Sequence, residues 1–330
     1  MMGILLTILY LLVISVVIQF SIAVMLIIFG KGKQSRQDKH SLDFNELFFD
    51  YTSLPRLQTV TARDGQNIHY RHYSARSNTV LILLHGSGWH SQYFFSLARF
   101  ISTEGLAEVY TPDLRGHGAT PERRGDVDYI DQLEDDLADL ILHIRKIHPN
   151  AKIVIGGHSS GGGLAIRFAG SRYAQQADGY LLLSPFLKYN APTTRANSGG
   201  WANPYTGRII GLSMLNMMGI HRFDFLAAIS FNMPKEARDG TETLLYSHRL
   251  NTAYAPRDYK RDLSTITQPV LVVAGTADEA FIAEQFEPVI SAYTLAEISL
   301  LPDVTHMGVV VGTDVQLVVK NWLIGINQSV

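Results

Sequence analysis

A short glycine-rich turn between an apolar run and a helical pattern constrains this chain more than any other feature. The segment reads Ile153-Val-Ile-Gly-Gly-His-Ser-Ser-Gly-Gly-Gly-Leu-Ala165 and contains the pattern G-x-S-x-G centred on Ser159. A serine on a sharp strand-to-helix turn has a strained backbone, and such a turn closes only where neighbouring positions lack Cβ atoms. The turn lifts the hydroxyl above the sheet and directs the helix N-terminus at it, which favours negative charge there. A glycine-rich turn with an idle serine is the alternative interpretation.

Strand-like and helix-like segments alternate through the body of the chain. Residues 58–62 and 67–73, separated by Asp64-Gly65, predict a β-hairpin. The apolar patterns then predict strands at 79–84, 107–110 (ending before Pro112), 152–155, 179–183, 269–274 and 297–301, and helices at 131–147, 161–169 and 310–326. Such alternation predicts an α/β fold, with a mostly parallel, buried sheet and helices on both faces.

One stretch interrupts this alternation. Residues 186–262 carry helical apolar patterns and loop signals, and the segment is too long for a bare connection. We expect it to form a helical cap inserted over one edge of the sheet. Thioether and aromatic side chains in it suit an adaptable apolar pocket for an acyl chain, although they suit the core of the cap equally well.

The N-terminal residues 4–29 contain no charged side chain. As a helix rising about 1.5 Å per residue, they would cross a hydrocarbon core of about 30 Å. A secretory signal peptide needs a basic start and a small-residue cleavage site, and Met1-Met2-Gly3 is not basic. A buried core helix is the other alternative, but few such helices lack charge on every face. We therefore expect one transmembrane anchor over residues 1–30.

The residues after this span favour an orientation. Basic side chains follow the span and none precedes it: Lys31, Lys33, Arg36 and Lys39. The positive-inside bias then places the remainder of the chain on the cytoplasmic side. Residues 31–50 are expected to form a polar, basic linker, either a solvated tether or one that contacts anionic lipid headgroups, and residues 51–330 the folded domain.

A serine hydroxyl is a weak nucleophile that needs a base, and the base needs an orienting carboxylate. Asp278 follows the apolar run at 269–274, and His306 follows the run at 297–301. Both therefore lie at the carboxyl ends of predicted strands, where ligands bind in open α/β sheets. The order Ser159, Asp278, His306 is that of a nucleophile–acid–base set in this kind of fold. Glu279 and Asp303 remain alternatives as the orienting acid.

Acyl transfer also needs hydrogen-bond donors for the tetrahedral oxyanion. The backbone N–H groups of Ser87, in a loop after the strand at 79–84, and of Ser160, the residue after Ser159, are the expected donors. Three other histidines, His85, His117 and His158, occur inside turn motifs, where a structural hydrogen bond is the better expectation.

Composition excludes several other functions. The chain has no cysteine, which rules out a thiol nucleophile, a disulfide scaffold and Cys-ligated metal sites. A net charge of −2 gives no basic footprint for nucleic acid. His143 and His148 have no carboxylate cluster near them in sequence, so we expect no metal site. The chemistry requires no cofactor, and no obligate protein partner is evident.

These motifs together resemble the α/β-hydrolase superfamily, in its monoglyceride-lipase/lysophospholipase branch, also called the serine aminopeptidase-like group. The resemblance spans about residues 55–330 and rests on His85-Gly86-Ser87-Gly88-Trp89-His90, Asp113-Leu114-Arg115-Gly116-His117-Gly118, Gly157-His158-Ser159-Ser160-Gly161-Gly162, Asp278 and His306. The family often has Glu where Trp89 stands and Met where Ser160 stands.

The resemblance implies a serine hydrolase with a catalytic triad that forms an acyl-enzyme on Ser159. With the anchor, it favours a carboxylic ester of a monoacyl lipid, a monoacylglycerol or lysophospholipid, as substrate. We expect the acyl chain to contact Trp89, Met214, Met217 and Met218. An amidase, peptidase or thioesterase on the same residues, or a non-catalytic membrane-tethered binding module, remains an alternative.

Overall fold

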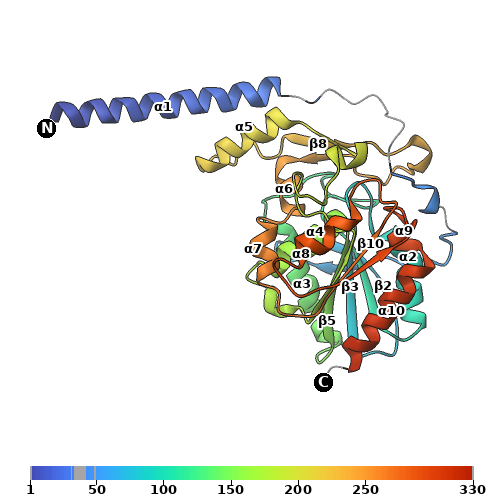
Figure 1. Ribbon diagram of the computed structural model, residues 1–330. Coiled ribbons are helices and arrows are strands. Elements are labelled where there is room, and N and C mark those ends of the chain that lie inside the picture. The colour runs from blue at the N-terminus through green and yellow to red at the C-terminus, as the bar shows by residue number, and fades with distance from the viewer. Residues whose placement is uncertain (1, 31, 33–41, 48–49, 329–330) are drawn as a thin grey trace.

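The computed structural model describes residues 2–30, 32, 42–47 and 50–328 (Figure 1). A long N-terminal helix extends beside an α/β body, and a smaller layer lies over one end of that body. The predicted fold class is confirmed: a mostly parallel sheet with helices on both faces carries an inserted cap.

An eight-stranded sheet forms the centre of the body, in the order β1-β2-β4-β3-β5-β6-β10-β11. The strands from β4 to β11 in this order run parallel, whereas β1 and β2 pair antiparallel with each other and β2 with β4. Their bounds are β1 Gln58–Thr61, β2 Asn67–Tyr73, β3 Thr79–Leu84, β4 Glu108–Asp113, β5 Lys152–His158, β6 Gly179–Leu183, β10 Val270–Gly275 and β11 Glu297–Leu301. β3, β4, β6 and β10 are buried along their whole length, as strands covered on both faces must be.

The predicted hairpin is present, with Gln58 opposite Tyr70 and Thr61 opposite Asn67. Gly65 in its turn has φ +87°, a left-handed conformation that glycine adopts without strain.

β4 extends further than the sequence predicted, because Pro112 does not end it. The part of β4 after Tyr110 pairs only with β2, with Tyr70 opposite Pro112, while β3 pairs with β4 only as far as Tyr110. A residue without an N–H group is tolerated where one side of the strand has no partner.

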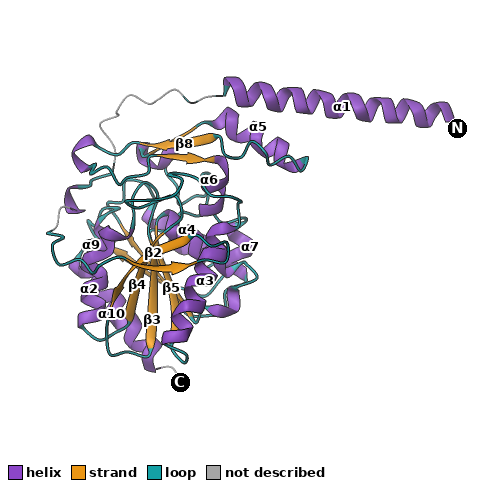
Figure 2. Ribbon diagram, turned by 180° about the vertical axis from the view of Figure 1, so that it is seen from behind, coloured by secondary structure: helices purple, strands orange, loops and turns teal. Residues whose placement is uncertain are grey.

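Helices cover both faces of the sheet (Figures 1 and 2). One group packs together as α2 Phe95–Thr103, α9 Gly308–Val311 and α10 Thr313–Gln328. The other group comprises α3 Gln132–Ile147, α4 Ser160–Ala169 and α7 Tyr259–Ser264. The helix expected at 310–326 is thus two helices, separated at Gly312. α8 is a short helix, Phe286–Ile290.

The inserted cap contains a small sheet as well as helices, which differs from the helical cap that the sequence predicted. β7 Ala202–Pro204, β8 Ala227–Phe231 and β9 Leu245–Ser247 form an antiparallel sheet in that order, seen around β8 in Figure 2. The cap helices are α5 Thr206–Met217 and α6 His248–Tyr254. Such short strands leave too little sequence for a period-two pattern to be recognised.

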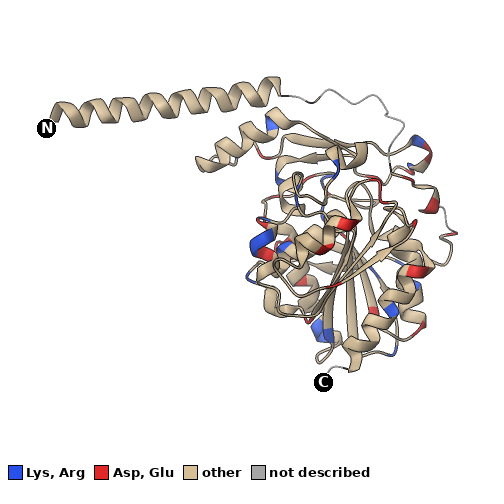
Figure 3. Cartoon of the chain, viewed as in Figure 1, with Lys and Arg blue, Asp and Glu red and all other residues tan. Residues whose placement is uncertain are grey.

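The N-terminal helix α1, Met2–Phe29, is long and apolar enough to cross a membrane, by length and composition. It has no charged residue along its whole length (Figure 3). Its C-terminal end packs against cap helix α5 through small residues: a Cβ on Gly211 would lie 2.6 Å from the carbonyl oxygen of Ala23. The backbone N–H of Arg208 also donates to the carbonyl of Gly30 at 3.3 Å.

The four basic residues of the expected linker, Lys31, Lys33, Arg36 and Lys39, lie outside the described residues. Residues 42–47, which we expected to belong to the linker, pack on the body instead. Leu42, Phe44 and Leu47 are buried there, and the segment ends in a 3₁₀ turn, Asn45–Leu47.

Candidate active site

Ser159 lies on the turn between β5 and α4 in a backbone conformation that side chains rarely adopt, with φ 54° and ψ −119°. Hydrogen bonds fix this residue from both sides: its N–H donates to Leu183 O at 3.0 Å, and its carbonyl accepts from the N–H groups of Gly163 and Phe186. Strain of this kind costs about 1–3 kcal/mol and persists only where surrounding contacts impose it.

Two glycines make this turn sterically possible. A Cβ on Gly157 would lie 2.2 Å from the carbonyl oxygen of Gly161, and a Cβ on Gly161 would lie 2.0 Å from that of Leu84. Both distances are far inside van der Waals contact, so the first and last positions of the G-x-S-x-G pattern require glycine here.

Asp278 and His306 form a buried pair. Oδ2 of Asp278, on the turn after β10, lies 2.9 Å from Nδ1 of His306, on the loop after β11. The other oxygen, Oδ1, accepts from the backbone N–H groups of Ala280 and Phe281 at 2.8 and 2.9 Å. This arrangement leaves Nε2 as the imidazole nitrogen that is not engaged by the carboxylate.

The environment keeps Asp278 ionised. Burial by itself would raise the pKa of this carboxyl group, but the neighbouring His306 and the hydrogen bonds from His306 and the Phe281 N–H outweigh burial and lower the pKa below its ordinary value. Asp278 is therefore a carboxylate at neutral pH, which is the form that stabilises an imidazolium.

The two alternative acids have different contacts. Glu279 accepts the backbone N–H of His306 through Oε2 at 2.9 Å and the backbone N–H of Asp43 through Oε1 at 3.0 Å. Asp303 is exposed, and its N–H donates to Thr276. Of the three acids, Asp278 is thus the one whose carboxylate meets the imidazole ring of His306.

Ser159 and His306 line the same small cavity, together with Gly86 and Ser87. Within the described residues, the backbone N–H groups of Ser87 and Ser160 have no hydrogen-bond acceptor. The side chain of Ser87 accepts a hydrogen bond from Nε1 of Trp201 in the cap at 3.0 Å, which ties this loop to the cap.

A hydrogen-bond chain joins the loop after β3, residues 85–90, to the serine turn and to His306. We call this loop the first loop. The N–H of Gly86 donates to the hydroxyl of Tyr93 at 2.6 Å, and that hydroxyl lies 3.0 Å from Nδ1 of His158. Nε2 of His158 lies 3.0 Å from the carbonyl oxygen of His306. Since a carbonyl only accepts, Nε2 of His158 carries the proton and Nδ1 accepts from Tyr93. Burial, followed by the proximity of His306, lowers the pKa of His158 well below its ordinary value, so its ring is neutral.

The other two turn histidines also make structural hydrogen bonds. Nε2 of His85 accepts the N–H of Leu114 at 3.0 Å, and Nε2 of His117 lies 2.5 Å from the hydroxyl of Tyr246 on β9. Tyr246 accepts the N–H of Gly88 at 2.8 Å, so His117 helps to hold the cap against the first loop.

The cavity beside Ser159 is small. Its accessible volume is only about 10 Å³, roughly what one water molecule requires. Its apolar walls come from four parts of the chain: residues 42–47, the loop after β3 with Trp89, the cap with Trp201, and the loop after β11 with Met307. Trp89, which we expected to contact substrate, therefore does lie at the cavity.

The three cap methionines do not line this cavity. Met214 and Met217 lie on α5, and Met218 follows it directly, with Met217 81% exposed. The glycines of α5 lie against α1, because the two helices pack so closely that the contact requires residues without a Cβ.

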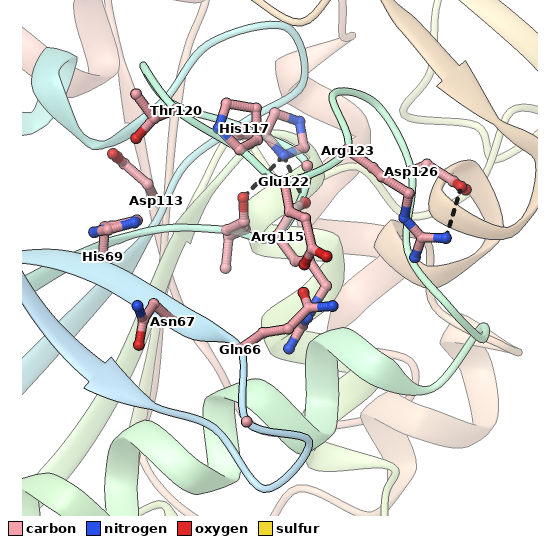
Figure 4. A pocket seen from close by; sticks show the side chains of 14 residues that line it. Gln66, Asn67, His69, Asp113, Arg115, His117, Thr120, Glu122, Arg123 and Asp126 are labelled. Atoms are coloured by element: carbon pink, nitrogen blue, oxygen red, sulfur yellow. Dashed lines mark hydrogen bonds and ion pairs between the residues drawn. The ribbon is translucent and has the colours of Figure 1, made fainter.

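A larger, polar cavity of about 390 Å³ lies between the β1–β2 turn and the loop after β4 (Figure 4). Its arginines are already paired: Arg115 with Asp136 and Asp64, and Arg123 with Asp126 and Asp128. Neither guanidinium is therefore available as an uncompensated charge for an anionic ligand.

The described residues include one cluster with metal-ligand chemistry, which the sequence did not suggest. The fold brings His72, Glu108 and His148 together, with ligand atoms within 4.8 Å of one another. Nε2 of His72 is 2.6 Å from Glu108, and Nε2 of His148 is 3.1 Å from the hydroxyl of Tyr110, so the cluster is satisfied by its own hydrogen bonds. Glu108 begins β4 and thus lies at the opposite end of the sheet from Ser159.

Comparison with known proteins shows which sequences and folds this chain resembles. The family model described as "Serine aminopeptidase, S33" matches residues 75–223, which include the serine turn. Human monoglyceride lipase is 26% identical over 260 residues, covering 77% of this chain and 81% of that protein. A soluble variant of monoglyceride lipase from Saccharomyces cerevisiae, solved with a substrate analogue, aligns with TM-score 0.63 and 18% identity over 86% of this chain and 99% of that one. The chain therefore has the α/β-hydrolase fold, and its sequence resembles the monoglyceride-lipase-like branch of that superfamily.

Other α/β hydrolases show the same fold. A thermophilic esterase from Thermogutta terrifontis aligns with TM-score 0.56 and 20% identity, covering 83% of this chain and 100% of the esterase. Leu42 and Leu47 line the cavity beside Ser159, and the sequence analysis did not single out either of them. Trp201, one of the cap aromatic side chains expected to suit an acyl pocket, lines it as well. The available signal was the apolar spacing of Leu42, Phe44 and Leu47 within an otherwise polar segment.

Proposed function

We propose that this α/β hydrolase is a membrane-anchored serine hydrolase that cleaves carboxylic esters of monoacyl lipids, monoacylglycerols or lysophospholipids. One observation carries the proposal: a buried carboxylate–imidazole pair, joined at 2.9 Å, borders the same cavity as a serine held on a strained turn. Serine hydroxyls are activated by just such a base and orienting acid.

The proposed reaction has two halves. Ser159 Oγ attacks the ester carbonyl while Nε2 of His306 takes its proton, and Asp278 stabilises the imidazolium. The resulting oxyanion accepts hydrogen bonds from the N–H groups of Ser87 and Ser160. When the C–O bond breaks, the alcohol leaves with the proton from His306 and the acyl group remains on Ser159. Water, deprotonated by His306, then attacks the acyl-enzyme; the bond to Ser159 Oγ breaks, His306 returns the proton to that oxygen, and the acid is released.

Three observations support a monoacyl lipid as substrate. The relatives named monoglyceride lipase cover most of this chain, the cavity has leucine and tryptophan walls, and the N-terminal helix is long enough to span a bilayer. A tethered hydrolase meets substrates that partition into the membrane. The positive-inside bias of Lys31, Lys33, Arg36 and Lys39 supports a cytoplasmic body.

The test of the chemistry is labelling of the full chain in detergent with a fluorophosphonate serine probe. Wild type should be labelled and Ser159→Ala should not, with Ser160→Ala, whose backbone N–H is retained, as the matched control. An unlabelled wild type, or equal labelling of wild type and Ser159→Ala, would overturn the assignment.

The test of the substrate is a panel with one matched acyl chain presented as monoacylglycerol, lysophospholipid, amide, peptide and thioester. Monoacyl esters should give the highest kcat/KM. Faster cleavage of the peptide or amide would favour the peptidase or amidase alternative, and faster cleavage of the thioester would favour a thioesterase.

Orientation is tested separately, by adding protease to sealed vesicles that contain the full chain. Protection of the body in right-side-out vesicles is expected, and its digestion there would overturn the cytoplasmic assignment.

A further inference from the structure

Residues 42–47, which we call the strap, lie over the cavity that contains Ser159 and His306. Leu42 and Leu47 line that cavity directly. Phe44 lies between the body and the cap: its ring centroid is 5.8 Å from that of Trp89 and 5.5 Å from that of Trp201. Side chains alternate along the strap, because Leu42 and Phe44 are buried while Asp43 and Asn45 are exposed. The strap thus directs one apolar face at the site.

Polar contacts fasten the strap to the loops that carry the reactive groups. The N–H of Asp43 donates to Glu279, which also accepts the N–H of His306. The hydroxyl of Thr305 donates to Oε1 of Glu46 at 2.8 Å. These contacts reach the residues next to Asp278 and His306, on the turns after β10 and β11.

The cavity beside Ser159 is too small for an ester. An accessible volume of about 10 Å³ holds about one water molecule, whereas ligand pockets for small organic molecules measure hundreds of Å³. Some wall must therefore move before an acyl group reaches Ser159. Trp201, in the cap, donates a hydrogen bond to the side chain of Ser87, and Trp89 lies on the same loop as Ser87. Both tryptophans are thus tied to the segment that carries the expected oxyanion donor, whereas the hydrogen bonds of strap residues Asp43 and Glu46 reach Glu279 and Thr305.

We propose that the strap is a lid. It covers Ser159 in the resting enzyme and moves away from the cavity when substrate enters. Phe44 is the side chain that holds it closed, between Trp89 and Trp201. This inference rests on the proposed serine hydrolase function for its effect on turnover, although strap opening itself can be measured without any catalysis.

The first test compares the rate at which a fluorophosphonate probe labels the full-length enzyme in detergent. Phe44→Ala should be labelled about tenfold faster than wild type, because the reactive fraction scales with the population of the open state. Asn45→Ala, an exposed strap position, is the matched control and should react at the wild-type rate. Phe44→Ala reacting no faster than wild type, at an unchanged unfolding temperature, would overturn the lid.

The second test needs no hydrolysis and so separates the lid from the proposed function. Met307 lines the cavity beneath the strap, and the chain has no cysteine, so Met307→Cys introduces a single buried thiol. Its modification by a water-soluble thiosulfonate should accelerate about tenfold when Phe44→Ala is added, and not with Asn45→Ala. Equal modification rates in all three backgrounds would overturn the lid even if Ser159 is the nucleophile. Faster modification in a chain that no serine probe labels would support the lid and overturn the function.

Discussion

Nε2 of His158 donates a hydrogen bond of 3.0 Å to the backbone carbonyl of His306. This bond ties the residue before Ser159 to the proposed base, although His158 is the last residue of β5 and His306 lies on the loop after β11. The two imidazole centroids are 4.5 Å apart. We therefore expect His158 to act as a positioning residue for His306, the proposed base.

We expect His158→Phe to lower kcat by up to about 10²-fold with little change in KM, because a small displacement of a base costs catalysis more than binding. His158→Gln, whose amide can still donate to the carbonyl, should recover most of this loss. Steady-state kinetics on a short-chain ester would measure both. A wild-type kcat for His158→Phe would show that His158 has no positioning role.

The orienting acid can be identified by substitution. Asp278→Asn should lower kcat by about 10⁴-fold, since an amide no longer stabilises the imidazolium and favours the wrong tautomer. Glu279→Gln and Asp303→Asn are the matched controls and should lose far less, because Glu279 meets only backbone N–H groups and Asp303 is exposed. If Glu279→Gln caused the larger loss, the roles of the two acids would have to be exchanged.

The serine turn should not tolerate a methyl group at its second glycine. In Gly161→Ala the Cβ would lie 2.0 Å from the carbonyl oxygen of Leu84, so the backbone must shift, at a cost of about 3 kcal/mol or more in the free energy of unfolding. Gly325→Ala is the control in α10, where a Cβ meets nothing within 4 Å, and it should raise stability by up to about 1 kcal/mol. Urea denaturation of each variant measures both values, and a Gly161→Ala protein as stable as wild type contradicts the steric account.

Stability should fall in mild acid because several buried histidines are neutral. Burial lowers the pKa of His85 from 6.5 to about 4, and it also lowers the pKa values of His117 and His158 well below the ordinary value. A histidine whose pKa is lowered by folding takes up its proton at a higher pH in the unfolded chain than in the folded one. The free energy of unfolding is therefore highest above about pH 6.5 and declines as the pH falls towards 4. The lowered pKa of His85 alone would account for a loss of about 3 kcal/mol in the free energy of unfolding over this pH range.

The measurement is the urea midpoint between pH 7.5 and pH 4.5. The lowered pKa of Asp278 also stabilises the folded chain, but this contribution is lost only below the unfolded-state pKa of 3.8. Asp278 therefore does not affect the decline between pH 7.5 and pH 4.5. His85→Gln should flatten the decline, whereas His221→Gln, at an exposed position, should leave its slope unchanged. A midpoint independent of pH in wild type would contradict neutral burial of these rings.

Local patterns determined a large part of this fold. Apolar runs and the turn at Asp64-Gly65 located the strands and the hairpin, because a strand buried on both faces needs an unbroken apolar run. Glycines around Ser159 located the serine turn. The topology of parallel sheets then placed Ser159, Asp278 and His306 at one edge, since each follows a strand of the same sheet.

Only the tertiary structure decided which neighbours these residues meet. Asp278 and Glu279 are adjacent in sequence, yet one carboxylate meets the imidazole of His306 and the other meets two backbone N–H groups, one of them from the strap. The apolar spacing of α5 indicated a packed face but not its partner, which proved to be α1 rather than the cavity. Sequence periodicity reports that a side chain is buried; the contacts that bury it join residues far apart in the chain, and those depend on how the elements pack.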